Sequence, residues 1–293
     1  MAFSGGSGTL SDPYLISNTT DLNTIATYYN SGYYYQQTND ITIGTFAPIG
    51  RSGQRTLYIR YDGGGYSIKD GTIYESTSGY NSGLFYDLAS SSGGYVKNLF
   101  FSNIRVSAGY GYAGLIAGGG GYSGMSIENV HADNNCSVVS NHAGCYAGGL
   151  IGCFYGGTIL KCSNSGSINS VSGSGGIVGY VNNGGSITNC YNNGNISSGG
   201  IDGAGGIVGF DHTYSGSLTL KYCYNSGDIS AIDYAGGIIG IGQNTYSIIQ
   251  NNYALNNTIT RVSGTATHFG RIVGNGNGTL LNNYALDTMA FVS

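Results

Sequence analysis

The sequence predicts an all-β fold, a right-handed parallel β-solenoid (β-helix) of about seven coils with roughly 30 residues each. Two motifs repeat at a fixed phase to one another, and the repeated region has almost no helical periodicity. A period between about 20 and 50 residues is typical of stacked units that cannot bury their apolar face alone. Right-handed connection is the default for parallel strands, which gives the expected hand.

The first motif is Gly-[Ile/Leu]-[Ile/Val]-Gly. Its complete copies are Gly149–Gly152, Gly176–Gly179, Gly206–Gly209 and Gly237–Gly240. With the degenerate copies included, the first apolar residues stand at 84, 115, 150, 177, 207, 238 and 272, which are 27 to 35 residues apart. We expect the apolar pairs to form inward ladders in parallel sheets, and the glycines to let the backbone turn tightly.

The second motif pairs a cysteine, tyrosine or aliphatic residue with an asparagine-rich corner. Its clearest copies are Lys161–Gly166, Asn189–Gly194 and Tyr222–Gly227. Cys162, Cys190 and Cys223 share one repeat position, which Tyr253 and Tyr284 hold later, so we expect small apolar fillers there. Coils about 4.8 Å apart also leave a disulfide open. The sequence has no CxxC pair, so no zinc site is expected.

Residues 1–80 differ from residues 81–293 and are predicted to form an N-terminal cap with irregular first coils. Asp21–Tyr29 has an acidic start and apolar residues at 22, 25, 26 and 29, which predicts a short amphipathic helix. Residues 81–293 are predicted to form the repeated solenoid. The apolar end of the sequence, Met289–Ser293, either covers the last coil or serves as an assembly surface.

The repeats resemble a known family. Gly-Gly-[Ile/Leu]-[Val/Ile]-Gly followed by Asn-Cys-Tyr-Asn is similar to GLUG-motif repeats of bacterial surface proteins, adhesins and some phage proteins. The opening, from Gly5–Thr9 through Asp12–Ile16, is also similar to the way such proteins begin. The resemblance covers about residues 3 to 286. It implies a β-solenoid and no particular catalytic activity, because the family is defined by repeats.

Composition excludes several classes of partner. The chain of 293 residues has 8% charged residues, a net charge of -4 and ten Lys plus Arg, so nucleic acid is not an expected partner. No apolar run approaches the roughly 18 residues of a membrane span. A surface rich in Asn, Ser, Thr and Tyr favours an extracellular or cell-surface protein. No cofactor is expected.

Two carboxylates are the candidate catalytic residues. Asp202 and Asp233 each lie five residues before the first apolar residue of a core, so coils stacked in register make them neighbours. A close carboxylate pair can serve as acid and nucleophile in glycoside hydrolysis; a solvated corner or a weak cation site are the alternatives. His131, His142, His212 and His268 occupy different phases of the repeat. Repeat phase therefore indicates no Ser-His-Asp or Cys-His group, and no metal site is expected.

Tyrosine is the expected binding residue, since it offers a flat apolar face and a hydroxyl at low entropic cost. The candidate binding residues are Tyr33, Tyr34, Tyr35, Tyr110, Tyr112 and Tyr122; scattered structural tyrosines are the alternative.

These features predict a non-enzymatic extracellular adhesin or fibre module that binds a surface glycan or a protein receptor and self-associates into filaments. The alternative is a polysaccharide-degrading β-helix enzyme, a hydrolase or lyase, acting through Asp202 and Asp233.

Overall fold

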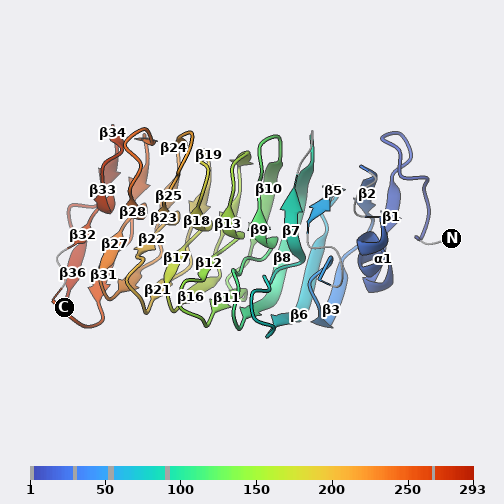
Figure 1. Cartoon of the computed structure of the whole chain (residues 1–293), viewed down its shortest axis with the longest axis horizontal. Coiled ribbons are helices and arrows are strands. Elements are labelled where there is room, and N and C mark those ends of the chain that lie inside the picture. Colours follow the sequence, from blue (N-terminus) through green and yellow to red (C-terminus); the bar gives the residue numbers. More distant parts are fainter. Residues whose placement is uncertain (1–2, 29–31, 52–55, 90–92, 266–267) are drawn as a thin grey trace.

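The chain is a parallel β-solenoid in a computed structural model that describes residues 3–28, 32–51, 56–89, 93–265 and 268–293. Its coils stack along the long axis, from the helical N-terminal end to the last coil at β33–β36 (Figure 1). The predicted fold class is confirmed. The described residues form three parallel sheets, which we call A (23 strands), B (eight strands) and C (five strands). Sheet B takes one strand from each coil, so the described residues form about eight coils. The hand stays a prediction.

The N-terminal half of the chain contains the three longest strands, of 14, nine and seven residues, beside shorter ones. Its strands are β1 (Tyr14–Ile16), β2 (Tyr34–Gln37), β3 (Ile41–Phe46), β4 (Leu57–Tyr58), β5 (Arg60–Asp62), β6 (Ser67–Glu75), β7 (Phe85–Ala89), β8 (Tyr95–Ala108), β9 (Ala117–Gly120), β10 (Ser126–Ala132) and β11 (Ser137–Ser140).

From β14 to β33 each coil has five short strands, three in sheet A, then one in sheet C and one in sheet B, and β34–β36 add three more strands to sheet A. The coil of β14 (Thr158–Leu160), β15 (Ser163–Asn164), β16 (Ser167–Ser170), β17 (Gly173–Gly175) and β18 (Val178–Val181) is representative. The other strands are β12 (Tyr146–Gly148), β13 (Ile151–Phe154), β19 (Gly185–Thr188), β20 (Tyr191–Asn192), β21 (Ile196–Ser198), β22 (Ala204–Gly205), β23 (Val208–Asp211), β24 (Leu218–Lys221), β25 (Tyr224–Asn225), β26 (Ile229–Ala231), β27 (Tyr234–Gly236), β28 (Ile239–Gly242), β29 (Ile248–Gln250), β30 (Tyr253–Ala254), β31 (Thr258–Arg261), β32 (His268–Gly270), β33 (Val273–Gly276), β34 (Thr279–Leu281), β35 (Tyr284–Ala285) and β36 (Ala290–Val292).

The predicted helix exists but begins earlier than its acidic residue suggested. Helix α1 spans Thr19–Thr24 and continues as a 3-10 turn, η1 (Ile25–Thr27). Asn18 Oδ1 accepts hydrogen bonds from the backbone N–H groups of Thr20 (2.8 Å) and Asp21 (3.0 Å), so Asn18 is the N-cap and Asp21 lies in the first turn. Tyr29 lies outside the described residues. No helix of the described residues is long and apolar enough to span a membrane.

The apolar pairs of the Gly-x-x-Gly cores face the interior, as predicted. Leu150 and Ile151 are fully buried, as are their counterparts in the next three coils. Backbone hydrogen bonds continue the ladder, since Leu150 N–H donates to Ile177 O over 3.0 Å and Ile177 N–H to Ile207 O over 3.0 Å. The interior is therefore one continuous column of aliphatic side chains.

Gly148, which directly precedes one copy of the first motif, and Gly179, which ends the next copy, are required by close approach and not by an unusual backbone angle. A Cβ on Gly148 would lie 1.9 Å from Ile151 O and 2.5 Å from Gly179 N, and one on Gly179 would lie 2.7 Å from Gly152 O. Both residues are outside the left-handed region. Sheets C and B therefore touch backbone to backbone, which only glycine permits.

Non-glycine residues form the recurring left-handed corner. Their φ values lie between 50° and 56°, at Asn98, Asn129, Lys161, Asn189, Tyr222, Asn251 and Asn282. Six of these residues directly precede a buried residue of the second motif, and Asn282 precedes Asn283, which is half-buried. Asparagine adopts this conformation with less strain than most residues, which accounts for its frequency here.

A buried asparagine ladder joins the two motifs. Asn192 Nδ2 donates to Gly194 O (2.7 Å) and to Asn225 Oδ1 (2.8 Å), while Asn192 Oδ1 accepts from Gly194 N–H (3.3 Å) and from Asn164 Nδ2 (2.8 Å). A Cβ on Gly176 would lie 2.4 Å from Asn192 Cγ. The first-motif glycine thus leaves room for the second-motif asparagine, which explains their fixed phase.

Cys162, Cys190 and Cys223 are buried and unbridged, so the prediction of small fillers is confirmed for them. The assignment of Tyr253 and Tyr284 to the same repeat position is wrong, because Tyr253 pairs with Tyr224 and the residues that follow Cys223 in register are Asn252 and Asn283. All six cysteines of the chain are free thiols.

We predict that Asn192→Ala lowers the free energy of unfolding by about 3 kcal/mol, because buried partners of its amide lose their hydrogen bonds. Chemical denaturation monitored by circular dichroism measures the change. Asn193→Ala, at an exposed neighbouring position, is the control and should change stability by less than about 0.5 kcal/mol. Equal effects of the two variants would contradict a structural role for the ladder.

Candidate functional site

The candidate site is a row of aromatic rings where sheets B and C meet outside the main core. We call Tyr112, Tyr146, Tyr180 and Phe210 the aromatic row. Its ring centroids lie 6.0 Å apart for Tyr112 and Tyr146, 4.7 Å for Tyr146 and Tyr180, and 5.5 Å for Tyr180 and Phe210. The row follows the solenoid axis because its members come from successive coils.

Strand register produces this row. On the outer side of sheet B, Cys153 pairs with Tyr180, Tyr180 with Phe210, and Phe210 with Ile241. Gly173 lies beside the row, where a Cβ would be 2.8 Å from Tyr146 Cδ1. Its missing side chain makes room for the Tyr146 ring. The rings form a second apolar cluster, separate from the main core.

Towards the C-terminal end, the row opens into a hollow of about 290 Å³. We call it the acidic hollow. Its lining residues are Ile201, Asp202, Phe210, Asp233, Tyr234, Ile241, Gln243 and Asn275. It combines an apolar floor with two carboxylates and two amides. Aromatic and apolar faces framed by a few hydrogen-bonding groups are typical of ligand sites.

Asp202 and Asp233, the predicted catalytic pair, line the same hollow, and their catalytic role stays a prediction. Both line the acidic hollow, on successive coils whose strands pair at Ala204 with Ala235. Asp202 also faces the aromatic row. Burial, and then the negative charge of Asp202 nearby, raise the pKa of Tyr146 above its ordinary value.

At the N-terminal end of the row lies Asp87, a half-buried residue whose Oδ1 is shielded from water. Gly119 lies between Asp87 and Cys153 in the strand register. Burial raises the pKa of Asp87 to about 7, and its Oδ1 has no hydrogen-bond partner among the described residues. Burial also raises the pKa of Cys153 to about 12, so the thiol is protonated at neutral pH and is a poor nucleophile.

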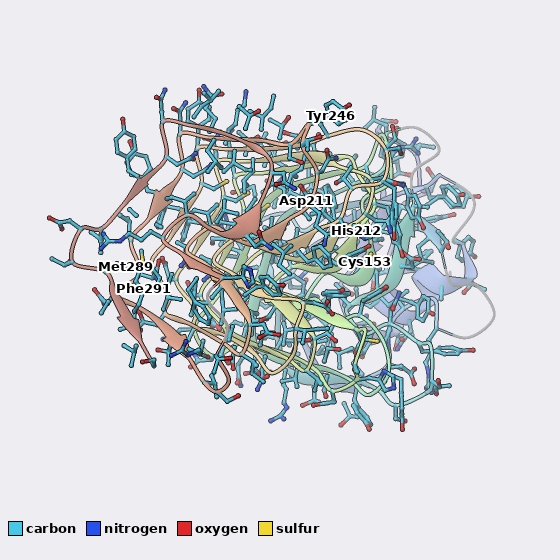
Figure 2. All side chains as sticks on the ribbon, turned by 60° about the vertical axis from the view of Figure 1, so that its left-hand side comes forward. Cys153, Asp211, His212, Tyr246, Met289 and Phe291 are labelled. Carbon is cyan, nitrogen blue, oxygen red and sulfur yellow. The ribbon has the colours of Figure 1, made fainter. Side chains whose placement is uncertain are left out.

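A buried acid lies one residue from the row. Asp211 Oδ2 accepts a hydrogen bond from Ser247 Oγ over 2.6 Å, and Asp211 Oδ1 accepts one from Thr213 Oγ1 over 2.5 Å. Burial raises the pKa of Asp211. His212 follows and stacks on Phe210, with ring centroids 5.3 Å apart. Figure 2 looks toward the C-terminal end and shows Tyr246 projecting from the upper edge, with Met289 and Phe291 at the last coil.

The six candidate tyrosines do not form one surface. Tyr35 is 1% exposed and packs with Phe3 and Tyr14 in the N-terminal aromatic core, so its assignment as a surface contact is corrected. Tyr33 is half-buried against Tyr14, with ring centroids 5.1 Å apart. Tyr34 lies under a guanidinium group, with Arg60 Cζ 4.9 Å from its ring centroid.

The other three candidates lie farther along the solenoid. Tyr110 is 47% exposed and lies 4.9 Å from the ring of His142. Tyr112 is half-buried and joins the aromatic row. Tyr122 is half-buried and stacks on Tyr155, with ring centroids 4.7 Å apart.

Sequence reasoning missed Tyr146, Tyr180, Phe210 and Tyr234. The sequence contained a signal for Tyr180 and Phe210. Both directly follow the second glycine position of a core, and so do Cys153, Ile241 and Asn275. No group of three or more His, Cys, Asp or Glu side chains suited to a metal ion occurs within the described part of the chain.

Two solved structures are similar to this chain. One is a Bacteroides ovatus protein described as a candidate immunoglobulin A1 protease, with a TM-score of 0.73 and 23% identity over 97% of this chain and 87% of that chain. The other is named IgA1 protease, with a TM-score of 0.61 and 17% identity over 92% of this chain. This chain spans 21% of that second protein. At such identities the likeness shows the fold, a β-solenoid.

No family model and no curated protein matches the chain. Membership of the GLUG-motif family therefore stays a prediction.

The prediction that the chain is not an enzyme is contradicted. Both similar structures carry the name of a protease, which is an enzyme. The sequence prediction relied on the lack of a catalytic motif in the repeats, and a repeat pattern does not reveal side chains that meet through three-dimensional stacking.

We predict that the unfolding free energy falls between about pH 4 and pH 7 through Asp87. Its folded pKa of about 7 exceeds its ordinary value of 3.8, so the native state holds the proton longer than the unfolded state. A difference of about three units corresponds to about 4 kcal/mol, fully lost above pH 7. Asp87→Asn should remove this dependence and be more stable than wild type at pH 8.

Denaturation curves at pH 4, 6 and 8 measure this difference. Asp12→Asn, at an exposed position, is the matched control and should follow wild type. A stability difference between Asp87→Asn and wild type that stays constant from pH 4 to pH 8 would show that Asp87 does not titrate as described.

Proposed function

We propose that this chain is a surface-exposed, extracellular β-solenoid that binds a glycan, or a glycan-bearing protein, in its acidic hollow. It would serve as the recognition surface of a secreted protease-like protein. The observation that carries the proposal is the pairing of an apolar aromatic floor with Asp202 and Asp233 in one hollow. We retain the division into an N-terminal segment, 1–80, and a repeat region, 81–293.

The chemistry of the hollow favours a sugar. The ring of Tyr234 is half-exposed and stacks on the ring of His268, with centroids 4.6 Å apart. The carboxylates of Asp202 and Asp233 accept hydrogen bonds from hydroxyl groups, and Gln243 and Asn275 can both donate and accept. An aromatic face plus uncharged and acidic hydrogen-bonding groups suits a neutral glycan better than a phosphate or a nucleic acid.

The similar structures suggest the first protein partner to test. Their names identify immunoglobulin A1 as the substrate of those proteins. We therefore propose an immunoglobulin as a partner of this chain. The candidate tyrosines Tyr110, Tyr112 and Tyr122 belong to this proposal as additional contacts along the solenoid, and Tyr33 and Tyr34 as contacts at the N-terminal end.

A second candidate function is hydrolysis of a polysaccharide in the same hollow. Adjacent coils lie about 4.8 Å apart, and a retaining glycosidase holds its two carboxyl groups about 5 Å apart. Asp202 and Asp233 occupy successive coils of the hollow, and this coil spacing is compatible with the separation that a retaining glycosidase needs.

We predict that Tyr234→Ala weakens glycan or immunoglobulin A1 binding about tenfold, which corresponds to about 1.4 kcal/mol of lost contact energy. A glycan array and surface plasmon resonance on the immunoglobulin measure it. Tyr246→Ala removes a tyrosine that is 77% exposed and outside the hollow, and should leave binding unchanged. Equal loss in both variants would contradict the proposed location.

The same preparations distinguish binding from hydrolysis. A reducing-sugar assay that detects turnover in wild type and none in Asp202→Asn or Asp233→Asn would support the hydrolase. Saturable binding without product would exclude it.

We also propose self-association through the last coil. Leu280, Leu281 and Phe291 are 52%, 44% and 49% exposed there, next to the open strands β34 and β36. Unpaired edges with apolar side chains pair readily with a second chain, and a head-to-tail contact that does not close gives filaments.

We predict that sedimentation velocity of the purified chain detects concentration-dependent oligomers, and that Leu280→Lys with Phe291→Lys removes them because charge opposes edge pairing. Tyr214→Lys, between β23 and β24 and 72% exposed, is the control because it lies at neither end of the solenoid. Monomers alone at high concentration would contradict the proposal.

A further inference from the structure

A gap interrupts a column of aromatic side chains on the outside of sheet A. Tyr191, Tyr224, Tyr253 and Tyr284 occupy one register position in four successive coils. In the preceding coil that position holds Ser163, and His131 precedes it. A serine between a histidine and a tyrosine leaves a hollow of about 460 Å³, which we call the serine notch. Its lining residues are Ser67, Phe100, Phe101, Ser102, His131, Ala132, Asp133, Ser163, Ser165 and Tyr191.

Ser163, His131 and Asn129 form a hydrogen-bonded relay at this notch. Ser163 Oγ lies 2.8 Å from His131 Nδ1, and His131 Nε2 lies 2.9 Å from Asn129 Oδ1. These distances are those expected between a nucleophile, its general base and the group that orients the base. The ring of His131 is also held by Phe100, with centroids 5.4 Å apart.

The relay continues across two more coils to a carboxylate. Asn129 Nδ2 donates to Asn98 Oδ1 over 2.9 Å, and Asn98 Nδ2 donates to Asp62 Oδ1 over 3.0 Å. Asp62 also pairs with Lys97, whose Nζ lies 3.3 Å from Asp62 Oδ2. A carboxylate only accepts hydrogen bonds, so the direction of donation at the Asp62 end of the relay is fixed.

This polarity sets the tautomer of His131. Because Asp62 must accept, the Asn98 amide nitrogen donates and its oxygen accepts from Asn129. The Asn129 oxygen then faces His131 and accepts from Nε2–H. Nδ1 is left with a lone pair, so Ser163 Oγ–H must donate to it. Burial lowers the pKa of His131, so the imidazole is neutral and able to accept a proton near pH 7.

We propose that the serine notch is an acyl-transfer site, in which Ser163 is the nucleophile, His131 the general base, and Asn129, Asn98 and Asp62 are positioning residues. This activity is separate from glycan binding in the acidic hollow, and the two sites share no lining residue.

The reaction would proceed in two balanced steps. Ser163 Oγ bonds to the carbonyl carbon of an ester or amide while its proton moves to His131 Nδ1. The bond to the leaving group breaks, and the leaving alcohol or amine takes the proton from His131. Water then attacks the acyl-serine with His131 as base, which releases the carboxylic acid and restores the serine hydroxyl. The hydroxyl groups of Ser165 and Tyr191 line the notch and are the available donors to the oxyanion.

The notch favours a neutral or basic acyl substrate. Asp133 is the carboxylate in its lining, and hydrogen bonds from Ser102 and two backbone N–H groups hold its pKa below the ordinary value despite partial burial. An anionic acyl group would be repelled. Phe100 and Tyr191 at the two ends offer apolar contact to groups on either side of the carbonyl.

A serine-reactive fluorophosphonate tests the proposal on the full chain. Wild type is incubated with the probe at pH 7.5, digested, and the labelled residue located by mass spectrometry. The expected label is on Ser163. Hydrolysis of p-nitrophenyl acetate and of a neutral peptide ester is followed in parallel. Ser163→Ala should abolish the labelling, and His131→Gln should slow it at least about 100-fold, the low end of a general base's contribution.

Ser67→Ala is the matched control, since Ser67 lines the same notch but lies three coils from Ser163 in the strand register; it should keep Ser163 labelling within tenfold of wild type. Circular dichroism checks that each variant is folded. No label on Ser163 in folded wild type overturns the proposal, and so does equal labelling in His131→Gln. The location of the label in wild type requires no variant, so a misfolded variant leaves the test intact.

Discussion

The solenoid depends on backbone contact between sheets B and C. Glycines bring the two sheets so close that a single Cβ would overlap a carbonyl oxygen. This contact fixes the angle at which the chain passes from one sheet to the other, and it recurs in every complete copy of the first motif. All other regular features, including the aliphatic column and the asparagine ladder, inherit their register from it. A methyl group at Gly148 or Gly179 would therefore disturb several coils at once.

The same contact creates the candidate site. Where the glycines meet, no side chain separates the sheets. The residues that directly follow these glycines in sheet B therefore lie in a row along the solenoid axis. Tyr180 and Phe210 lie in that row and form part of a continuous aromatic floor. Asp202 and Asp233 stand beside the floor for the same reason, since both precede the glycine contact by a fixed number of residues.

The sequence was sufficient for the architecture because repeat position maps directly onto spatial position in a solenoid. Leu150 and Ile177 had to share a ladder, and Asp202 and Asp233 had to reach the same hollow. It was insufficient wherever coil length varies. His131 lies 16 residues after the apolar residue at 115, whereas Ser163 lies 13 residues after Leu150, so their pairing is hidden in the repeat phase. The burial of Tyr35 was equally hidden, because the cap has no repeat to compare with.

The asparagine ladder also divides the solenoid into parts that differ in their local stability against opening. Asn164 donates to Asn192 and Asn192 donates to Asn225, in the same direction along the axis, and Asn225 ends the column by donating to Gly227 O. At the same register position, alanine precedes the column at Ala132 and follows it at Ala254. Aligned amides polarise one another, so the coils they span should open as a single cooperative foldon. The last coils, beyond Ala254, should exchange their amide hydrogens first.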